Sequence, residues 1–273
     1  MANGENRLES IQLPSLPYVS HEILLEVNQP EADMARLVAS LGQDPALSAR
    51  VVSAANTAFF LGRGEVRSLD AATMRLGVNR IRVLSASILL HNRFDPRRCP
   101  GFDAARYWQH SIATAGAAGG LAQEAGLESA PARLGGLLHS IGLLLLAHGF
   151  PAEMERVFAA HRQTPDARLG SLVRGELEFD HYQAGAMLLR EWELPDTLCG
   201  LVEQLGSTAA YRAPGMLAVL RGAADWAAEG FGPPPEVLLD YGPGEAALER
   251  LGAQCRREQE SNEALARLLA GGQ

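Results

Sequence analysis

Residues 134–150 read LGGLLHSIGLLLLAHGF, which is the most apolar stretch of the chain. Glycines and two histidines, His139 and His148, interrupt its leucines. A membrane-spanning helix needs about 20 consecutive apolar residues, so this stretch is too short and too interrupted to cross a bilayer. We therefore predict a buried helix over residues 132–148, with the rest of a helical core built around it.

The flanking sequence has a helical periodicity almost throughout. Residues 34–41, MARLVASL, place apolar side chains at positions i, i+3, i+4 and i+7, which is the spacing of one helix face. Alanine and leucine, which both favour helix, are abundant, whereas the alternating patterns typical of strands are missing. The predicted fold class is therefore all-α.

Capping residues indicate where the helices begin and end. Asp44, which precedes a proline, is typical of a helix start. Ser68 is a second N-cap candidate, and Gly77 is typical of a helix end. Asn79 is expected to cap a helix over residues 80–92. Further helices are predicted at residues 103–125, from 151 onward, and at 171–177, 180–192, 196–205, 214–228 and 245–270.

The segment 94–102 contains two proline-bearing turns and is the best candidate for a boundary between two packed helical subdomains. The expected parts are a flexible N-terminus (1–10), an N-terminal subdomain (about 11–98), a second subdomain (about 99–230) and a C-terminal helical extension (231–273).

The C-terminal extension has an apolar face. Leu248, Leu251 and Cys255 share it, and leucines near residue 268 continue it. Such a helix either docks on its own domain or pairs with another helix. The second alternative predicts a homo-oligomer formed through the C-terminal helices.

The composition limits the classes of function. The chain has 273 residues, 47% of them hydrophobic, and a formal net charge of −8. This acidity argues against a nucleic-acid binder, which needs a basic surface to displace counterions. The three cysteines form no C-x-x-C pair, and the N-terminus has no apolar signal segment. We expect a cytoplasmic protein that binds neither nucleic acid nor membrane.

One window of the chain is basic. Residues 63–98 hold eight arginines against three acidic residues, a balance that suits a small anionic ligand or an acidic partner. The alternative is that these arginines are scattered over the surface of two helices. The helices around Gly77 could also imitate a helix-turn-helix, although the overall acidity opposes that interpretation. The candidate anion patch consists of Arg63, Arg67, Arg75, Arg80 and Arg82.

Several short motifs follow one another in a recognisable order. They are LPSLP (13–17), DPALS (44–48), SLDAA (68–72), WQHS (108–111), GLLHSIG (136–142) and HYQAGAMLLREWELP (181–195). Each motif alone is weak, but together they span residues 11 to about 230. On these motifs the chain resembles the HD-related output domain (HDOD) family of bacterial signalling proteins.

The resemblance implies a second subdomain similar to the HD-type phosphohydrolases, in which histidines and aspartates bind one or two metals. By motif, His110 takes the first histidine position and His139 takes the histidine of the His-Asp doublet. Ser140 stands in place of the doublet's aspartate, and Asp225 is the best candidate for the last aspartate. Of the auxiliary positions only His181 is retained.

Ser140 weakens the case for a metal, because a carboxylate supplies charge and can bridge two ions whereas a neutral hydroxyl does neither well. Two imidazoles and the Asp225 carboxylate could still hold one Zn²⁺. The alternative is a polar relic in which the histidines are hydrogen-bonded within the core, since each unpaired group there costs about 1–3 kcal/mol. We predict the relic, with no catalytic residue, metal or cofactor.

The resulting functional hypothesis is a non-enzymatic regulatory module. It would bind a signalling protein in trans, or a small anionic ligand, in or near the cleft between its two subdomains. The alternative is a metal-dependent phosphohydrolase acting on a nucleotide or phosphodiester, with His110, His139 and Asp225 as ligands.

Overall fold

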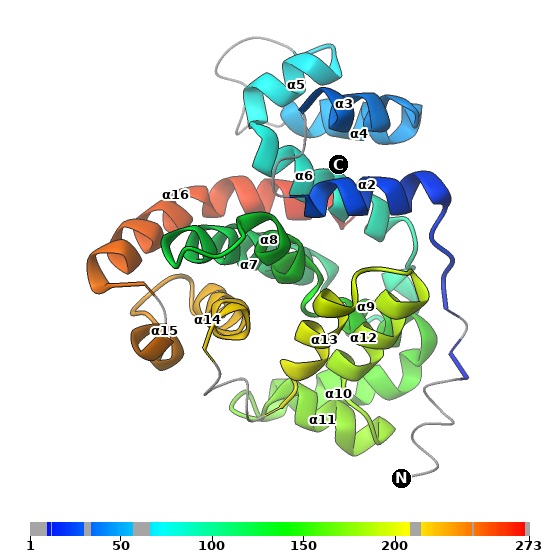
Figure 1. The fold of residues 1–273 in the computed structure, drawn as a ribbon. Coiled ribbons are helices and arrows are strands. Elements are labelled where there is room, and N and C mark those ends of the chain that lie inside the picture. The colour runs from blue at the N-terminus through cyan, green and yellow to red at the C-terminus, as the bar shows by residue number, and fades with distance from the viewer. Residues whose placement is uncertain are drawn as a thin grey trace.

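The computed structural model describes residues 10–11, 13–29, 34–56, 66–207, 214–241 and 243–270. Within these ranges the chain forms helices, turns and loops with no strand, which confirms the all-α prediction. Figure 1 shows the first helices gathered at one end of the molecule and the later helices forming its larger part. Except for Ser10, the predicted flexible N-terminus lies outside the described residues.

The N-terminal group of described helices surrounds one buried helix, α6. Every residue from Ile81 to Leu90 of α6 is buried, and helices α2, α4 and α5 all pack against it. The helices of this group are α2 (Tyr18–Asn28), α3 (Met34–Gly42), α4 (Pro45–Ala55), α5 (Leu69–Leu76) and α6 (Val78–His91).

The predicted caps of this group are mostly correct. The Asp44 carboxylate accepts a hydrogen bond from the Leu47 amide at 3.0 Å, and the Ser68 hydroxyl accepts one from the Ala71 amide at 3.2 Å. Asn79 is not a cap, however, because α6 already begins at Val78. Gly77 has φ +78°, a conformation that glycine adopts at no steric cost. It therefore ends α5 and precedes α6 directly.

The C-terminal group is built around α7 (Ala104–Glu124), with which α8, α14 and α16 all pack. The predicted helix over residues 103–125 is α7, and Asp103 caps it by accepting a hydrogen bond from the Arg106 amide at 2.9 Å. The other elements are η2 (Pro96–Arg98), α8 (Ser129–Leu138), α9 (Ile141–Gly149), α10 (Pro151–Gln163), α11 (Leu169–Leu177), α12 (His181–Glu191), α13 (Asp196–Gln204), α14 (Met216–Ala228), α15 (Glu236–Tyr241) and α16 (Glu245–Leu269).

The predicted single helix over residues 132–148 is wrong in one respect, because the chain breaks it at His139 and Ser140 to form α8 and α9. Close backbone contacts account for the break. A Cβ atom on Gly142 would lie 1.8 Å from the carbonyl oxygen of His181. A Cβ atom on Gly136 would lie 2.9 Å from the Cα atom of Ala115. The two glycines therefore let α9 approach α12 and let α8 approach α7.

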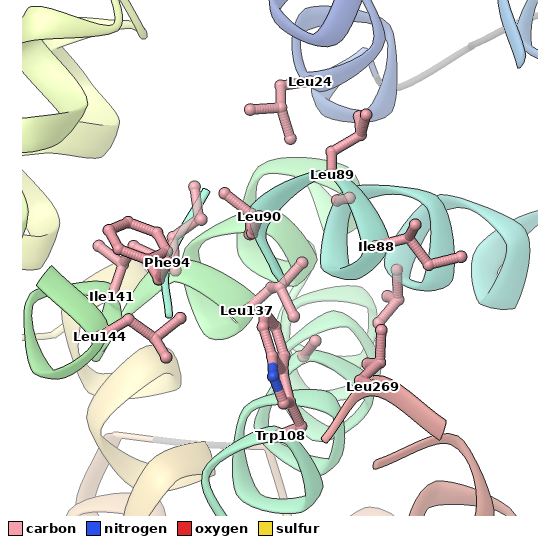
Figure 2. Packing of buried hydrophobic residues seen from close by; sticks show 14 of the residues in the cluster. Leu24, Ile88, Leu89, Leu90, Phe94, Trp108, Leu137, Ile141, Leu144 and Leu269 are labelled. Atoms are coloured by element: carbon pink, nitrogen blue, oxygen red, sulfur yellow. The ribbon is translucent and has the colours of Figure 1, made fainter. Parts of the chain in front are cut away.

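One hydrophobic core connects the two groups of helices. Figure 2 shows Leu24 of α2 and Ile88 of α6 in the same cluster as Trp108 of α7, Leu137 of α8 and Leu269 of α16. A second cluster lies between α7, α14, α15 and α16. The two subdomains are thus packed through a shared apolar interior.

The C-terminal extension docks on its own chain. Helix α16 packs along α7 and buries Leu248, Leu251 and Leu265 there. Hydrogen bonds reinforce the contact, one of them from the Gln109 side chain of α7 to Glu263 at 3.2 Å. This apolar face is therefore covered within the chain and is not available to pair with another helix. Figure 1 shows α16 running across α7 and α8.

Residues 129–149 are long and apolar enough to cross a membrane by length and composition, with a mean hydropathy of 1.4. However, 83% of the most apolar window is buried inside the protein. Such a high buried fraction is typical of helices in a protein core.

We expect Gly142→Ala to lower the free energy of unfolding by about 1–3 kcal/mol, because the added methyl group overpacks the contact between α9 and α12. Gly175→Ala on α11 is the matched control, because a Cβ atom there meets nothing within 4 Å. This control should raise the stability by about 0.5–1 kcal/mol. Urea denaturation of both variants measures the difference, and equal stabilities would contradict the close-contact account.

Candidate functional site

The break between α8 and α9 places His139 in the protein interior, with 3% of its surface exposed. Its Nδ1 atom lies 2.7 Å from the carbonyl oxygen of Gly136. A carbonyl oxygen can only accept, so Nδ1 carries the hydrogen and Nε2 keeps its lone pair. This tautomer is the one that would present Nε2 to a ligand.

His110 from α7 meets His139. The two ring centroids are 5.1 Å apart, with the rings in an edge-to-face arrangement. Burial lowers the pKa of His110 to about 4, and the nearby Arg106 contributes to the shift. Burial, together with the charge that His110 would carry, lowers the pKa of His139 to about 3. Both imidazoles are therefore neutral at pH 7.

His181 is the second buried histidine besides His139, and it lies at the first position of α12. Asp180 caps this helix and accepts hydrogen bonds from the amides of Tyr182 at 3.0 Å and Gln183 at 2.9 Å. Burial lowers the pKa of His181 to about 4, although Asp180 opposes the shift. Nδ1 of His181 has no hydrogen-bond partner among the described residues.

Ser140 adds a hydroxyl to this interior. It is 4% exposed and interacts with the hydroxyl of Tyr107, which also interacts with Ser111. Burial raises the pKa of Tyr107 well above its usual range, and these two contacts only partly offset the effect. None of the three hydroxyl oxygens has a well-formed hydrogen bond within the described chain. The predicted polar relic is therefore incompletely satisfied by protein groups, a situation typical of sites for buried water.

Asp225 faces an arginine. It lies on α14, and its carboxylate accepts a hydrogen bond at 3.0 Å from Nε of Arg221, four residues earlier. Only 14% of the Arg221 side chain is exposed. Its positive charge contributes to lowering the pKa of both His139 and His181. The charge of Arg221 thus acts on the histidines and is paired with the carboxylate that the alternative interpretation names as a metal ligand.

The residues present do not fit a metal ion. In the part of the chain that the structure describes, no three His, Cys, Asp or Glu side chains gather in a way that could hold one. His110 and His139 do come together, but Asp225 does not complete a ligand set with them. The remaining donors near the break are neutral hydroxyls and imidazoles beside a cationic guanidinium, which disfavours a second cation.

Arg221 is the site residue that the sequence analysis missed. The available signal was its spacing, because residues i and i+4 are neighbours on a helix face and Arg221 precedes Asp225 by four positions. Arg221 is far in sequence from the HD-like motifs, so the sequence alone did not indicate that it acts on their histidines.

The described members of the candidate anion patch do not all lie on the surface. Arg63 lies outside the described residues. Arg82 is only 5% exposed, and burial lowers its pKa, so its assignment to a surface patch was wrong. The reason is that α6 is buried on all sides over this stretch. Arg67 is exposed, Arg75 donates to the carbonyl of Ala55, and Arg80 pairs with Glu258 of α16 at 3.3 Å.

Comparison with known proteins places this geometry in context. A family model described as the HDOD domain matches residues 13–206. An uncharacterized protein of Treponema pallidum is 24% identical over 209 residues, which cover 74% of this chain and 38% of that protein. The chain therefore spans little more than a third of the length of this curated relative.

Solved structures share the fold. A provisionally named phosphohydrolase from Shewanella amazonensis is 25% identical with a TM-score of 0.73, over 98% of both chains. A provisionally named signal transduction protein from Marinobacter aquaeolei has a TM-score of 0.80 at 24% identity, over 98% of this chain and 66% of that one. An HDOD domain protein of unknown function from Geobacter sulfurreducens has a TM-score of 0.73 at 20% identity, over 98% and 97% of the two chains.

The buried histidines predict a pH-dependent stability. The folded-state pKa values of His139 and His181 lie below the value of 6.5 for an unperturbed histidine, so the unfolded chain binds more protons between about pH 6.5 and pH 4. Stability is then fully present above about pH 6.5 and falls as the pH decreases, by on the order of 1 kcal/mol per pH unit for each histidine.

His139→Asn keeps a donor for the Gly136 carbonyl but cannot be protonated. Its free energy of unfolding, measured by urea denaturation across this pH range, should therefore decrease less steeply than that of the wild type. Parallel pH profiles for the two proteins would contradict the assignment of a neutral buried His139.

Proposed function

The chain belongs to the HDOD domain family, and on that premise we propose that it is a regulatory module of bacterial signal transduction that acts in the cytoplasm by binding and does not hydrolyse phosphoesters. The observation that carries the proposal is the Arg221 guanidinium, which pairs with Asp225 and lowers the pKa of both His139 and His181. A positive charge supplied by the protein stands beside the histidines that bind metal in hydrolytic relatives.

The chemistry of hydrolysis supports this conclusion. Metal-dependent hydrolases lower the pKa of a bound water molecule and so generate the nucleophile. Ser140 contributes no negative charge to hold the ion, and the carboxylate of Asp225 is already engaged by Arg221. We propose that this polar core lies at the break between α8 and α9 and has a structural role there.

A metal-dependent phosphohydrolase is the alternative. It is favoured by the contact between His110 and His139 and by the tautomer of His139, which leaves Nε2 able to coordinate. The provisional name of the Shewanella protein points in the same direction for that protein. This alternative requires Arg221 to leave Asp225, so that the carboxylate can join the two histidines.

Binding in trans is part of the proposal. The Treponema relative and the Marinobacter protein are both longer than the region that this chain matches, so additional segments accompany the same fold in those proteins. We infer that the module transmits its signal through a contact with a partner protein.

Restoring the missing charge tests the proposal. The double variant Ser140→Asp with Arg221→Gln supplies the doublet carboxylate and releases Asp225, so we expect it to bind close to one Zn²⁺ or Mn²⁺ per chain. The wild type should remain near zero after incubation with either metal and desalting, as measured by elemental analysis.

Ser140→Asn with Arg221→Gln is the matched control, because asparagine has the shape of aspartate without its charge. This control should bind no metal. The proposal is wrong if the wild type retains close to one ion per chain, loses it on His139→Ala, and hydrolyses nucleotides or phosphodiesters in the metal-bound form.

A further inference from the structure

A cleft of about 990 Å³ lies away from the histidines, between the start of α6, the middle of α7 and the outer part of α16. Gly77, Val78 and Asn79 form its edge on α6, and Gly116 and Gly120 form its floor on α7. The volume is at the upper end of the range for small-molecule sites. Figure 1 shows α16 crossing α7 next to α6. The residues that line the cleft come from both groups of helices.

The charges that line the cleft are predominantly positive. Four arginines face two glutamates there: Arg80, Arg133, Arg250 and Arg257 against Glu124 and Glu258. Two arginines form ion pairs across the cleft, Arg80 with Glu258 at 3.3 Å and Arg250 with Glu124 at 3.4 Å. The lining therefore keeps an excess of positive charge in a protein whose net charge is −8.

Arg133 is the central cation of this lining. It projects from α8 towards α7, where Gly119 leaves room for it, since a Cβ atom on that glycine would lie 2.5 Å from the Cζ atom of Arg133. One of its terminal nitrogens donates to the Ser129 hydroxyl at 3.3 Å. Its buried Nε has no hydrogen-bond partner among the described residues. Arg133 lines the cleft, and the terminal nitrogens of its guanidinium are the donors that would bind an anion there.

Burial and the neighbouring Arg82 both lower the pKa of Arg133, and Glu258 opposes them. Burial is the larger cause, so the guanidinium of Arg133 has lost part of its contact with water. An anionic ligand would supply negative charge beside it.

The uncharged residues of the lining are suited to the part of a ligand that carries no charge. Apolar side chains from several helices and amide side chains also line the cleft. The apolar residues are Leu76, Val83, Ile112, Leu251 and Leu265, and the amides are Asn79, Gln123, Gln254 and Asn262. An apolar lining with amide donors and acceptors can hold a planar heterocycle and read its edge.

The amino end of α6 adds to the attraction for an anion. Gly77 precedes the helix without any side-chain cap, and unsatisfied amides at a helix start favour negative charge. The start of α6 and the four arginines line the same cleft.

From the cavity, its excess of arginines and its mixed apolar and amide lining, we propose that this cleft binds a nucleotide, with the phosphates against Arg133 and Arg80 and the base against the uncharged lining formed with α16. The inference rests on the proposed function in one respect, that occupancy of the cleft is the signal. The ligand would contact α6 in the N-terminal group of helices and α7 and α16 in the C-terminal group. It would therefore stabilise one arrangement of the two groups relative to each other.

Isothermal titration calorimetry of the full chain tests the site, with ATP, GTP, CTP and UTP as probes and with inorganic tripolyphosphate and the four nucleosides for comparison. We expect at least one nucleotide to bind, and to bind at least about tenfold more tightly than both tripolyphosphate and its own nucleoside.

Three variants locate the binding. A Cβ atom on Gly116 meets nothing within 4 Å, so Gly116→Leu should fill the cleft without disturbing the fold and abolish binding. Arg133→Gln should weaken binding by about tenfold or more. Glu258→Gln removes a competing carboxylate and should strengthen it. Arg156→Gln is the matched control, because Arg156 is an exposed arginine paired with Glu176 on another face, and it should have no effect.

The proposal is overturned if no nucleotide binds at millimolar concentration, if tripolyphosphate binds as tightly as the nucleotides, or if Gly116→Leu binds like the wild type. These outcomes are distinguishable from failure of the proposed function, which would appear as metal binding and hydrolysis that depend on His139, whatever the state of the cleft.

Discussion

The close approach of α9 to α12 at Gly142 is the contact on which the rest of the interior depends. Because a side chain at this position would overlap the carbonyl oxygen of His181, the two helices can meet only through a glycine. Their contact fixes the direction of α9, and Gly136 fixes that of α8 against α7. The chain between them must turn inside the protein, and this turn consists of His139 and Ser140.

Burial at that turn then determines the electrostatics. The resemblance to HD-type phosphohydrolases implies metal cations at the corresponding region of those enzymes. Here the buried imidazoles are held neutral, Ser140 carries no charge, and Arg221 supplies the cation that balances Asp225. Among the described residues this region holds no cluster of three potential metal ligands, and an excess of arginines lines a separate cleft between the two groups of helices.

Much of this fold could be predicted from the sequence, because helix periodicity and capping are local. Asp44 and Ser68 act as N-caps, as their positions indicated. What could not be predicted depends on tertiary contacts. Arg82 looked like a surface residue, yet α6 is enclosed on every side. The break at His139 requires backbone contacts with α7 and α12. Arg221 acquires its role only when α14 packs beside the histidines.

The most direct test of a neutral interior without metal is a side-chain ¹⁵N NMR titration of the histidines, with and without Mn²⁺. His139 and His181 should remain uncharged from pH 7 down to about pH 5, with His139 as the Nδ1–H tautomer, and their signals should be unchanged by the paramagnetic ion. Titration of either ring near its ordinary pKa of about 6.5, or selective loss of the signals of both rings when Mn²⁺ is added, would contradict this account.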